Sequence, residues 1–247
     1  MADVGRIDVV CVTRNGPNPA WLRNLDRLPV NKLIVERSSP LLAARRRALD
    51  KVSTEWFLWL DDDVYLCDGW MREAVKHVRR DVGAIQGREW LHGFGEKWDL
   101  AVNRFRWSKP AVEYEPGHRG TLVNTLMRME AVRDWDPPDL ELYAYEDYLI
   151  TQHVLSRGYR WLDVKLPSWH TRTWVKHFTA AIRDMRALKQ VEPARSKAKR
   201  MVKLLLSTVF ALIPFSAKRL GTVKMGIRVR VFLLYQNISC ILGLMFA

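Results

Sequence analysis

One short stretch constrains the fold more than any other part of the chain. Five apolar residues, Trp56–Leu60, are followed directly by three carboxylates, Asp61, Asp62 and Asp63. A continuous apolar run of this length, bounded by polar sequence, predicts a strand that is buried on both faces of a parallel sheet. The carboxylates then lie at the carboxyl end of the strand, which is the edge where open α/β sheets bind ligands.

Three adjacent acids repel one another unless a cation neutralises them. A hard divalent ion, Mn²⁺ or Mg²⁺, that also bridges to phosphate oxygens is a natural partner for such a cluster. The alternative is a solvated acidic turn that closes a core strand, and these three residues alone do not exclude it.

The segments around this stretch alternate between strand and helix patterns. The predicted strands cover residues 7–12, 32–35, 56–60, 82–85, 121–127 and 160–164. The predicted helices pass through residues 21–25, 41–49, 70–78 and 146–155. Asp68 is expected to cap the third helix, and residues 88–119 are expected to form loops with one helix near 98–107. This succession predicts an α/β fold with a mostly parallel, doubly wound sheet flanked by helices.

The net charge of +13 is concentrated in one part of the chain. Residues 1–170 hold 25 Lys and Arg against 25 Asp and Glu, whereas residues 171–230 hold 15 against 2 and residues 231–247 hold none. Composition therefore predicts a catalytic domain over 1–170 and a basic, then uncharged, tail over 171–247. A nucleic-acid-binding protein usually carries its basic residues on the folded domain. We therefore expect an anionic membrane surface as the partner of the tail, and no nucleic acid.

The tail alternates basic and apolar segments. Its first part has apolar residues at helical spacing with basic residues on other faces, which predicts an amphipathic helix: Trp174, Phe178, Ile182, Met185 and Leu188 against Lys176, Arg183, Arg186 and Lys189. The apolar runs 204–217 and 231–247 are both shorter than the about 20 residues of a comfortable membrane span. A hairpin of two spans would also place the basic link 218–230 outside, against the positive-inside rule.

We therefore expect tail helices that lie along the cytosolic membrane surface. The alternative is a helical appendage that packs on the body or forms a homo-oligomer with a second subunit. The three cysteines, Cys11, Cys67 and Cys240, fit no disulfide or metal motif and predict reduced thiols of an intracellular protein. The start of the sequence is acidic and lacks the pattern of a signal peptide, so the chain is expected to begin in the cytosol.

Several motifs together resemble one enzyme family. Residues 44–49 (Ala-Arg-Arg-Arg-Ala-Leu) and 54–63 (Thr-Glu-Trp-Phe-Leu-Trp-Leu-Asp-Asp-Asp) resemble, without a gap, the stretch ARNRGL…TGEYVLFLDDD of family 2 glycosyltransferases with the A-type fold. Further matches follow in the family's order: Gly120 with Asn124, Glu146-Asp147 with Leu149, Gly158-Tyr159-Arg160, and His170. The chain departs from the family at three places: Arg46 replaces the usual Asn, Ala48 the usual Gly, and Glu36-Arg37 the frequent Asp-Asp.

The resemblance implies a fold, an activity and a set of site residues. It implies that Asp63, His170 and Asp61 hold a Mn²⁺ or Mg²⁺ ion on the diphosphate of a nucleotide-sugar. Contacts to the nucleotide are implied for four residues: Thr13, Glu36, Arg45 and Asp61. Asp147 is implied as the base that activates the acceptor, with Glu146 orienting the acceptor or the base. Plainer readings remain for three sites: Arg45 as a helix-surface arginine, His170 as a core histidine, and Glu146-Asp147 as acids that favour a helix N-terminus.

We expect an inverting, metal-dependent glycosyltransferase that transfers a sugar to a lipid-linked acceptor at the cytosolic membrane face. Polyprenyl-phosphate glycosyl synthases have this general plan, so the acceptor class includes polyprenyl phosphates. A metal-dependent nucleotidyltransferase is an alternative, because it also uses strand-end acids and a metal. A non-catalytic adaptor that binds membranes or nucleic acid is the third class.

Overall fold

The computed structural model describes most of the chain. The described residues are 4–37, 40–91, 109–137, 146–171, 174–191, 201–202, 204–205, 208 and 227–245. They divide into two compact units, of which the first ends at Thr171 and the second contains the helices beyond it. Each unit is described by itself.

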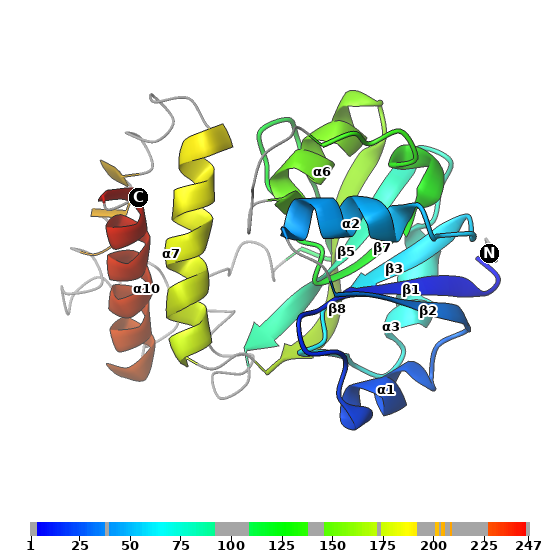
Figure 1. The fold of residues 1–247 in the computed structure, drawn as a ribbon, viewed down its shortest axis with the longest axis horizontal. Coiled ribbons are helices and arrows are strands. Elements are labelled where there is room, and N and C mark those ends of the chain that lie inside the picture. Colours follow the sequence, from blue (N-terminus) through cyan, green and yellow to red (C-terminus); the bar gives the residue numbers. More distant parts are fainter. Residues whose placement is uncertain are drawn as a thin grey trace. The chain divides into compact units, whose positions relative to one another are not determined.

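The first unit is built on an eight-stranded sheet with helices beside it (Figure 1). The strands are β1 (Ile7–Val12), β2 (Val30–Glu36), β3 (Trp56–Leu60), β4 (Val64–Leu66), β5 (Val82–Leu91), β6 (Ala111–Glu113), β7 (Asn124–Arg128) and β8 (Arg160–His170). Their order is β2-β1-β3-β7-β5-β8-β4, and β6 pairs with β8. Strands β2, β1, β3, β5 and β8 run in one direction, whereas β7, β4 and β6 run in the other.

Helices cover the two sides of this sheet. They are α1 (Pro19–Leu25), α2 (Leu41–Leu49), α3 (Trp70–Ala74) and α6 (Glu146–Ser156), with 3₁₀ turns at Val75–His77 and Met129–Ala131. Figure 1 shows α2 and α6 on one side of the sheet and α1 and α3 on the other. Local sequence explains the start of α1, because Asn18 Oδ1 accepts the backbone N–H of Trp21 at 2.9 Å and Pro19 occupies the first turn.

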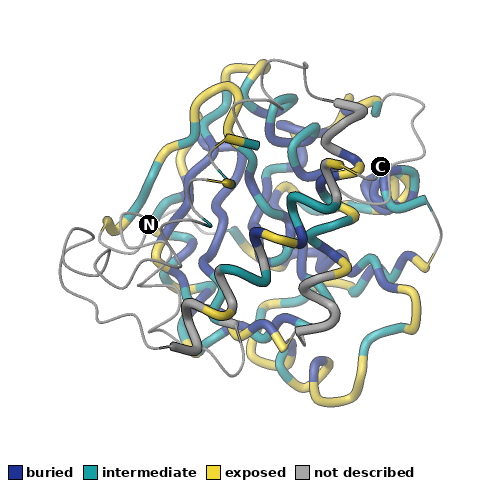
Figure 2. The backbone as a smooth tube through the Cα atoms, turned by 90° about the vertical axis from the view of Figure 1, so that its left-hand side faces the viewer, coloured by how far each residue is buried: buried dark blue, intermediate teal, exposed yellow. Residues whose placement is uncertain are grey.

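The core of the first unit follows the apolar strands. All five residues of β3 are buried, Trp59 among them, and Trp21 of α1 and Trp161 of β8 are also fully enclosed. Burial of a large apolar side chain stabilises a fold by roughly 1.5–3 kcal/mol, so these residues account for much of the core energy. Figure 2 shows long buried segments along the strands, whereas the helices alternate buried and exposed residues.

The structure confirms a mixed α/β fold with a mostly parallel central sheet, and it gives one strand a direction that the sequence pattern left open. Strand β7 lies between β3 and β5 and is antiparallel to both. A buried strand has the same apolar pattern whether it is parallel or antiparallel to its neighbours, so the sequence does not reveal the direction of β7. At one end of β7, the guanidinium of Arg128 lies 4.8 Å from the centre of the Trp56 ring, and its Nη1 lies 2.9 Å from Glu55 Oε1.

Other differences are local. Strands β4 and β6 were not predicted because three residues are too few to show a period. The prediction that Asp68 caps a helix is wrong: Gly69 occupies the N-cap of α3 with φ of 77°, and Asp68 pairs with Arg27. The helix predicted near residues 98–107 lies outside the described residues.

The second unit contains α7 (Trp174–Val191) and α10 (Ile227–Met245), which pack against each other. On α7, Met185 of the predicted apolar face is buried, and Arg183 and Arg186 of the predicted basic positions are exposed. None of the described helices combines the length and the hydrophobicity that crossing a membrane requires.

Candidate functional site

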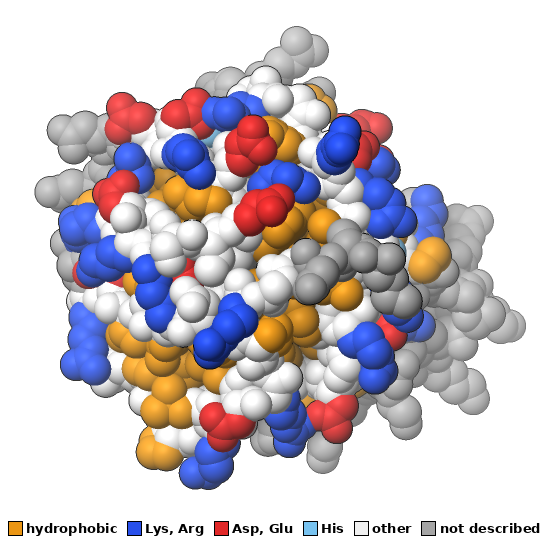
Figure 3. Space-filling model, turned by 90° about the vertical axis from the view of Figure 1, so that its right-hand side faces the viewer, with side chains coloured by type: hydrophobic (Ala, Val, Ile, Leu, Met, Phe, Trp, Pro, Cys, Tyr) orange, Lys and Arg blue, Asp and Glu red, His pale blue; other side chains and the backbone are white. Residues whose placement is uncertain are grey.

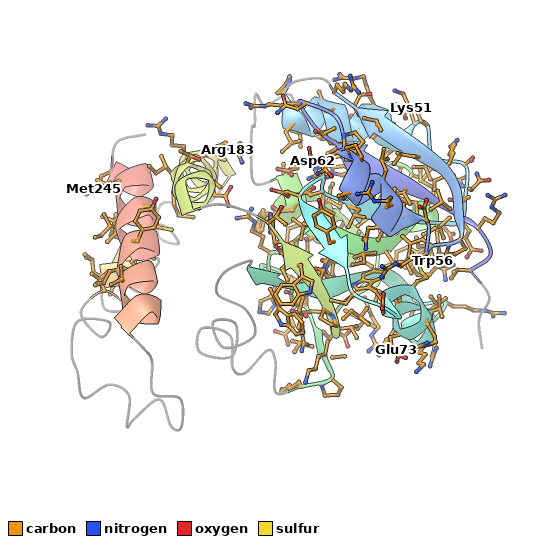
Figure 4. The ribbon with its side chains drawn as sticks, turned by 90° about the horizontal axis from the view of Figure 1, so that it is seen from below. Lys51, Trp56, Asp62, Glu73, Arg183 and Met245 are labelled. Atoms are coloured by element: carbon orange, nitrogen blue, oxygen red, sulfur yellow. The ribbon has the colours of Figure 1, made fainter. Side chains whose placement is uncertain are left out.

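The three acids of the central stretch lie where β3 ends. Figure 4 shows Trp56 and Asp62 at opposite ends of this strand. The backbone of Asp61 is held on two sides: its N–H donates to the carbonyl of Val123 at 3.0 Å, and its carbonyl accepts the indole N–H of Trp21 at 2.8 Å. The backbone N–H of Val64 donates to the same carbonyl at 3.1 Å, so residues 61–64 form a tight turn into β4.

Each of the three carboxylates has its own partner. The pairs are Asp61 with Arg45, Asp62 with Thr13, and Asp63 with His170. This arrangement relieves the repulsion that three adjacent acids suffer on their own. It does not cancel the negative potential completely: burial, followed by the charges of Asp61 and Asp62, raises the pKa of the Cys11 thiol far above its usual range.

Arg45 connects the end of β3 to the start of α6. Its Nε donates to Glu146 Oε1 at 2.9 Å, its Nη2 lies 3.7 Å from Asp61 Oδ1, and its guanidinium carbon lies 4.9 Å from the centre of the Trp59 ring. Only 6% of the side chain is exposed. Burial alone lowers the pKa of Arg45, but Glu146 and Asp61 outweigh this and raise it. The guanidinium predicted to contact the nucleotide therefore stays charged and lies in a buried ion network.

Asp147 is the second acid of α6 and has a cationic partner that the sequence did not indicate. The Nε of Arg119 donates to Asp147 Oδ1 at 2.7 Å, and the same oxygen accepts the backbone N–H of Tyr148 at 2.9 Å. The hydroxyl of Thr151 donates to the Asp147 carbonyl at 2.6 Å and accepts the N–H of Gly120 at 3.0 Å. The hydrogen bond between Gly120 and Thr151 thus holds the preceding residue, Arg119, beside Asp147.

Gly120 has to be a glycine for this approach. A Cβ atom at this position would lie 2.4 Å from the Trp161 ring and 2.8 Å from Thr151 Oγ1. The glycine that was one element of the family resemblance is therefore explained here by close packing against a buried tryptophan.

His170 ends β8 between two carboxylates. Its Nε2 lies 3.1 Å from Asp63 Oδ1, its Nδ1 contacts Glu89 Oε2, and the side chain is 2% exposed. The backbone N–H of Thr171 donates to the Asp63 carbonyl at 2.8 Å, which keeps the two chain ends together. Glu89 was missed because residues 88–119 were expected to be loops, whereas β5 continues to Leu91.

The two remaining predicted nucleotide contacts lie at the ends of β1 and β2. The carbonyl of Glu36 accepts the N–H of Thr13 at 3.0 Å. The carboxylate of Glu36 is held by two cations of or beside α2, with Lys51 Nζ at 3.0 Å and Arg47 Nε at 4.0 Å. Glu36 is therefore neutralised within the protein.

Within the described residues, no group of three or more His, Cys, Asp or Glu side chains is arranged to hold a metal ion. Asp61, which was also predicted as a ligand, lies with its Oδ1 3.7 Å from Arg45 Nη2. Asp63 and His170 fit the requirement as a pair, because two ligands about 2.1 Å from an ion at right angles lie roughly 3 Å apart. Mg²⁺ usually binds one or two carboxylates and completes its shell with water and substrate phosphates. The pair suits an ion that arrives with a phosphate ligand.

The fold and site define a mixed α/β protein with a paired acidic cluster at the carboxyl end of its central strand. No family model matches the sequence, and no curated protein matches it. Among solved structures, the chain is similar to the crystal structure of A197 from STIV, with 16% identity and a TM-score of 0.45. The match covers 68% of this chain and 86% of that one. A likeness at this level carries no conclusion about function.

Proposed function

We propose that the protein is an inverting, metal-dependent glycosyltransferase of the A-type fold. It transfers a sugar from a nucleotide-sugar to a lipid-linked acceptor, such as a polyprenyl phosphate, at the cytosolic membrane face. The observation that supports this most directly is one chain of contacts, Asp61–Arg45–Glu146. It joins the acid cluster at the end of β3 to the helix turn that carries Asp147, so donor-side and acceptor-side acids share one site.

On the donor side, the bond between the anomeric carbon and the phosphate oxygen breaks, and a nucleoside diphosphate leaves. Asp63 and His170 would hold the Mn²⁺ or Mg²⁺ ion, which when bound neutralises the charge that grows on the leaving diphosphate. The hydroxyl of Thr13 is held at the same edge by Asp62 and accepts the N–H of Gly16 at 3.2 Å, so the loop after β1 is ordered beside the nucleotide position.

On the acceptor side, an oxygen attacks the anomeric carbon from the face opposite the leaving group, which inverts its configuration. If this oxygen is a hydroxyl, its proton goes to Asp147 as general base. If it is a phosphate oxygen, it is already ionised and needs no base. The guanidinium of Arg119, beside Asp147, suits an anionic acceptor in either role.

Attachment to the membrane is proposed from the second unit. On α10, the exposed apolar side chains Val231, Ile238 and Met245 recur every seven residues and therefore share one face, whereas Asn237 and Ser239 are buried. Basic residues dominate positions 171–230. An apolar helix face beside a basic segment suits an anionic lipid surface, in which the helix lies in the plane of the membrane.

No nucleic-acid partner is proposed, because the excess of basic residues lies at positions 171–230 and residues 1–170 are balanced in charge. On the face shown in Figure 3, basic and acidic side chains are interspersed. A nucleic-acid-binding protein usually carries its basic residues on the folded domain.

A screen of nucleotide-sugars with Mn²⁺ or Mg²⁺ and a polyprenyl phosphate acceptor tests the proposal, with free nucleoside diphosphate as the readout. A glycosyltransferase releases nucleoside diphosphate. A nucleotidyltransferase attacks the α-phosphate and releases pyrophosphate instead. A non-catalytic adaptor yields neither product, and either of these results would overturn the proposal.

A further inference from the structure

We propose that Glu89 is a positioning residue, which holds the ring of His170 so that Nε2 faces Asp63. The orientation of the ring follows from contacts within the first unit. Its consequence for binding a metal–nucleotide complex rests on the proposed function.

The strand pairing places these three residues together from three different elements. In the parallel pair of β5 and β8, Leu91 lies opposite His170 and Glu89 lies opposite Ser168. In the antiparallel pair of β4 and β8, His170 lies opposite Val64, which is the residue that follows Asp63 in the sequence. The imidazole therefore projects between a residue of β5 and the turn that follows β3.

Neighbouring aromatic packing keeps the two strand ends together. The rings of Trp90 and Trp169 meet edge to face, with their centres 4.9 Å apart. Both tryptophans are adjacent in sequence to the two residues of the proposed pair, and pairs of this geometry contribute about 0.5–1.5 kcal/mol beyond their burial. Glu89 and His170 are thus held at a fixed separation.

Hydrogen-bond chemistry then decides which nitrogen of the ring is presented to Asp63. An ionised carboxylate only accepts hydrogen bonds, so the contact between Glu89 Oε2 and Nδ1 places a hydrogen on Nδ1. By the same rule Asp63 Oδ1, 3.1 Å from Nε2, accepts from the other nitrogen in the metal-free chain, so Nε2 is the nitrogen at which a metal ion would take the place of a hydrogen. Carboxylates that accept from a ligand histidine fix its orientation in metal sites, and their loss lowers metal affinity about 10–100-fold.

Burial makes the role of Glu89 specific. The ring of His170 is 2% exposed, whereas the side chain of Glu89 is 21% exposed and has access to water. Water can solvate the Glu89 carboxylate, so its contact with the buried ring is not required for its own solvation. The ring, in contrast, is almost completely enclosed, so bulk solvent does not reach it to take the place of Glu89.

The first arm of the test uses the metal-free full chain. With histidine labelled by ¹⁵N, the Nδ1–H of His170 should give a far-downfield proton resonance, assigned by its absence in His170→Gln and distinguished from Nε2–H by the couplings of each ¹⁵N nucleus to the ring protons. The resonance should persist in Glu55→Ala, which removes an exposed carboxylate that pairs with Arg128. It should be lost in Glu89→Ala and Glu89→Leu, which lack an acceptor. Two such variants are used so that one misfolded protein does not decide the result.

The second arm measures binding of Mn²⁺ together with UDP or GDP by electron paramagnetic resonance. Glu89→Ala or Glu89→Leu should bind about 10–100-fold more weakly than the unaltered chain, and the spin-echo modulation from a coordinated histidine nitrogen should disappear. Glu89→Gln, whose amide oxygen still accepts from Nδ1, should restore most of the affinity and the modulation. Glu55→Ala should match the unaltered chain and so exclude a general effect of charge.

The outcomes separate this proposal from the proposed function. A downfield Nδ1–H resonance that survives in Glu89→Ala, or variants that bind Mn²⁺ and nucleotide like the unaltered chain, would overturn the role of Glu89. Failure of the unaltered chain to bind any Mn²⁺–nucleotide complex would count against the glycosyltransferase proposal. In that case the ring resonance alone decides whether Glu89 positions His170.

Discussion

Arg119 Nε lies 2.7 Å from Asp147 Oδ1, so the acid expected to act on the acceptor already has a cationic partner. The side chain of Arg119 is 29% exposed, whereas that of Asp147 is 10% exposed. The arginine is therefore the more accessible of the two side chains to an incoming group. This asymmetry leads to separate predictions for the two residues.

Replacing Asp147 by Asn keeps the shape of the side chain but removes its capacity to take a proton. For a hydroxyl acceptor, turnover should fall roughly 10²–10⁴-fold while affinity for the donor changes little. Steady-state kinetics together with calorimetric titration of nucleoside diphosphate measure both quantities. Near-normal turnover of Asp147→Asn would remove Asp147 as the base and favour a phosphate acceptor.

Replacing Arg119 by Ala removes the guanidinium and leaves Asp147 in place. If the acceptor is anionic, the KM for the acceptor should rise about tenfold or more, because a charge-assisted hydrogen bond contributes about 1.5–3 kcal/mol. The KM for the donor should stay unchanged. Arg133→Ala, an exposed arginine outside this cluster, is a matched control. Equal kinetics of Arg119→Ala and the control would contradict a contact between Arg119 and the acceptor.

Removing either member of the Asp63–His170 pair should weaken metal-dependent binding of nucleoside diphosphate and leave the fold intact. Loss of Asp63 also relieves repulsion within the acid cluster, so Asp63→Ala should not be destabilised as strongly as a core variant. Titration calorimetry with and without Mn²⁺ measures the binding of nucleoside diphosphate, and circular dichroism checks that the fold is intact. If both variants keep their affinity with metal present, the metal site is wrong.

Asp8 should make the stability of the fold dependent on pH. Burial alone raises the pKa of Asp8, but hydrogen bonds from the Ser53 backbone, Asn31 and the Ser53 hydroxyl outweigh it and lower the pKa. Because the folded pKa is lower than the unfolded value near 3.9, this stabilisation is present above that value and is lost as pH falls through the folded pKa.

Asp8→Asn should therefore lower the free energy of unfolding by about 2–3 kcal/mol at neutral pH. The difference from the unaltered chain should shrink in acid. Urea unfolding at pH values from neutral down to about 3, near the usual pKa of Asp, measures this difference in the free energy of unfolding. Asp50→Asn is the control, since Asp50 is exposed and pairs with Arg46 on the helix surface. A difference that does not depend on pH would show that the charge of Asp8 is not responsible.

The apolar face of α10 should contact lipid. Ile238→Arg places a charge at the centre of this face and should lower binding to phosphatidylserine-containing vesicles several-fold, since a charge is costly within the apolar region. Leu22→Arg is the matched control, because Leu22 is an exposed apolar residue of the first unit. Co-sedimentation with vesicles compares the two. Equal loss in both variants would contradict a specific role of α10.

Sequence patterns predicted the elements whose period is strong. Strands β1 and β3 and helix α2 have the predicted bounds because long apolar runs and regular helical spacing leave little ambiguity. The direction of β7 was not predictable, because strand direction depends on tertiary pairing. Arg119 and Glu89 lie in or beside the segment without a period, and only the folded sheet brings them to Asp147 and His170. The chemical roles of these residues stay predictions.

The position of β7 also sets the order in which the sheet can be completed during biosynthesis. The ion pair of Glu55 with Arg128, at the Trp56 end of β3, joins residues 73 positions apart in the sequence. A nascent chain has already made β1, β2, β3 and β5 before β7 leaves the ribosome. Until then the facing edges of β3 and β5 have unpaired backbone groups, and such edges attract other strands. Fragments that end before residue 124 should therefore aggregate, however stable the finished sheet is.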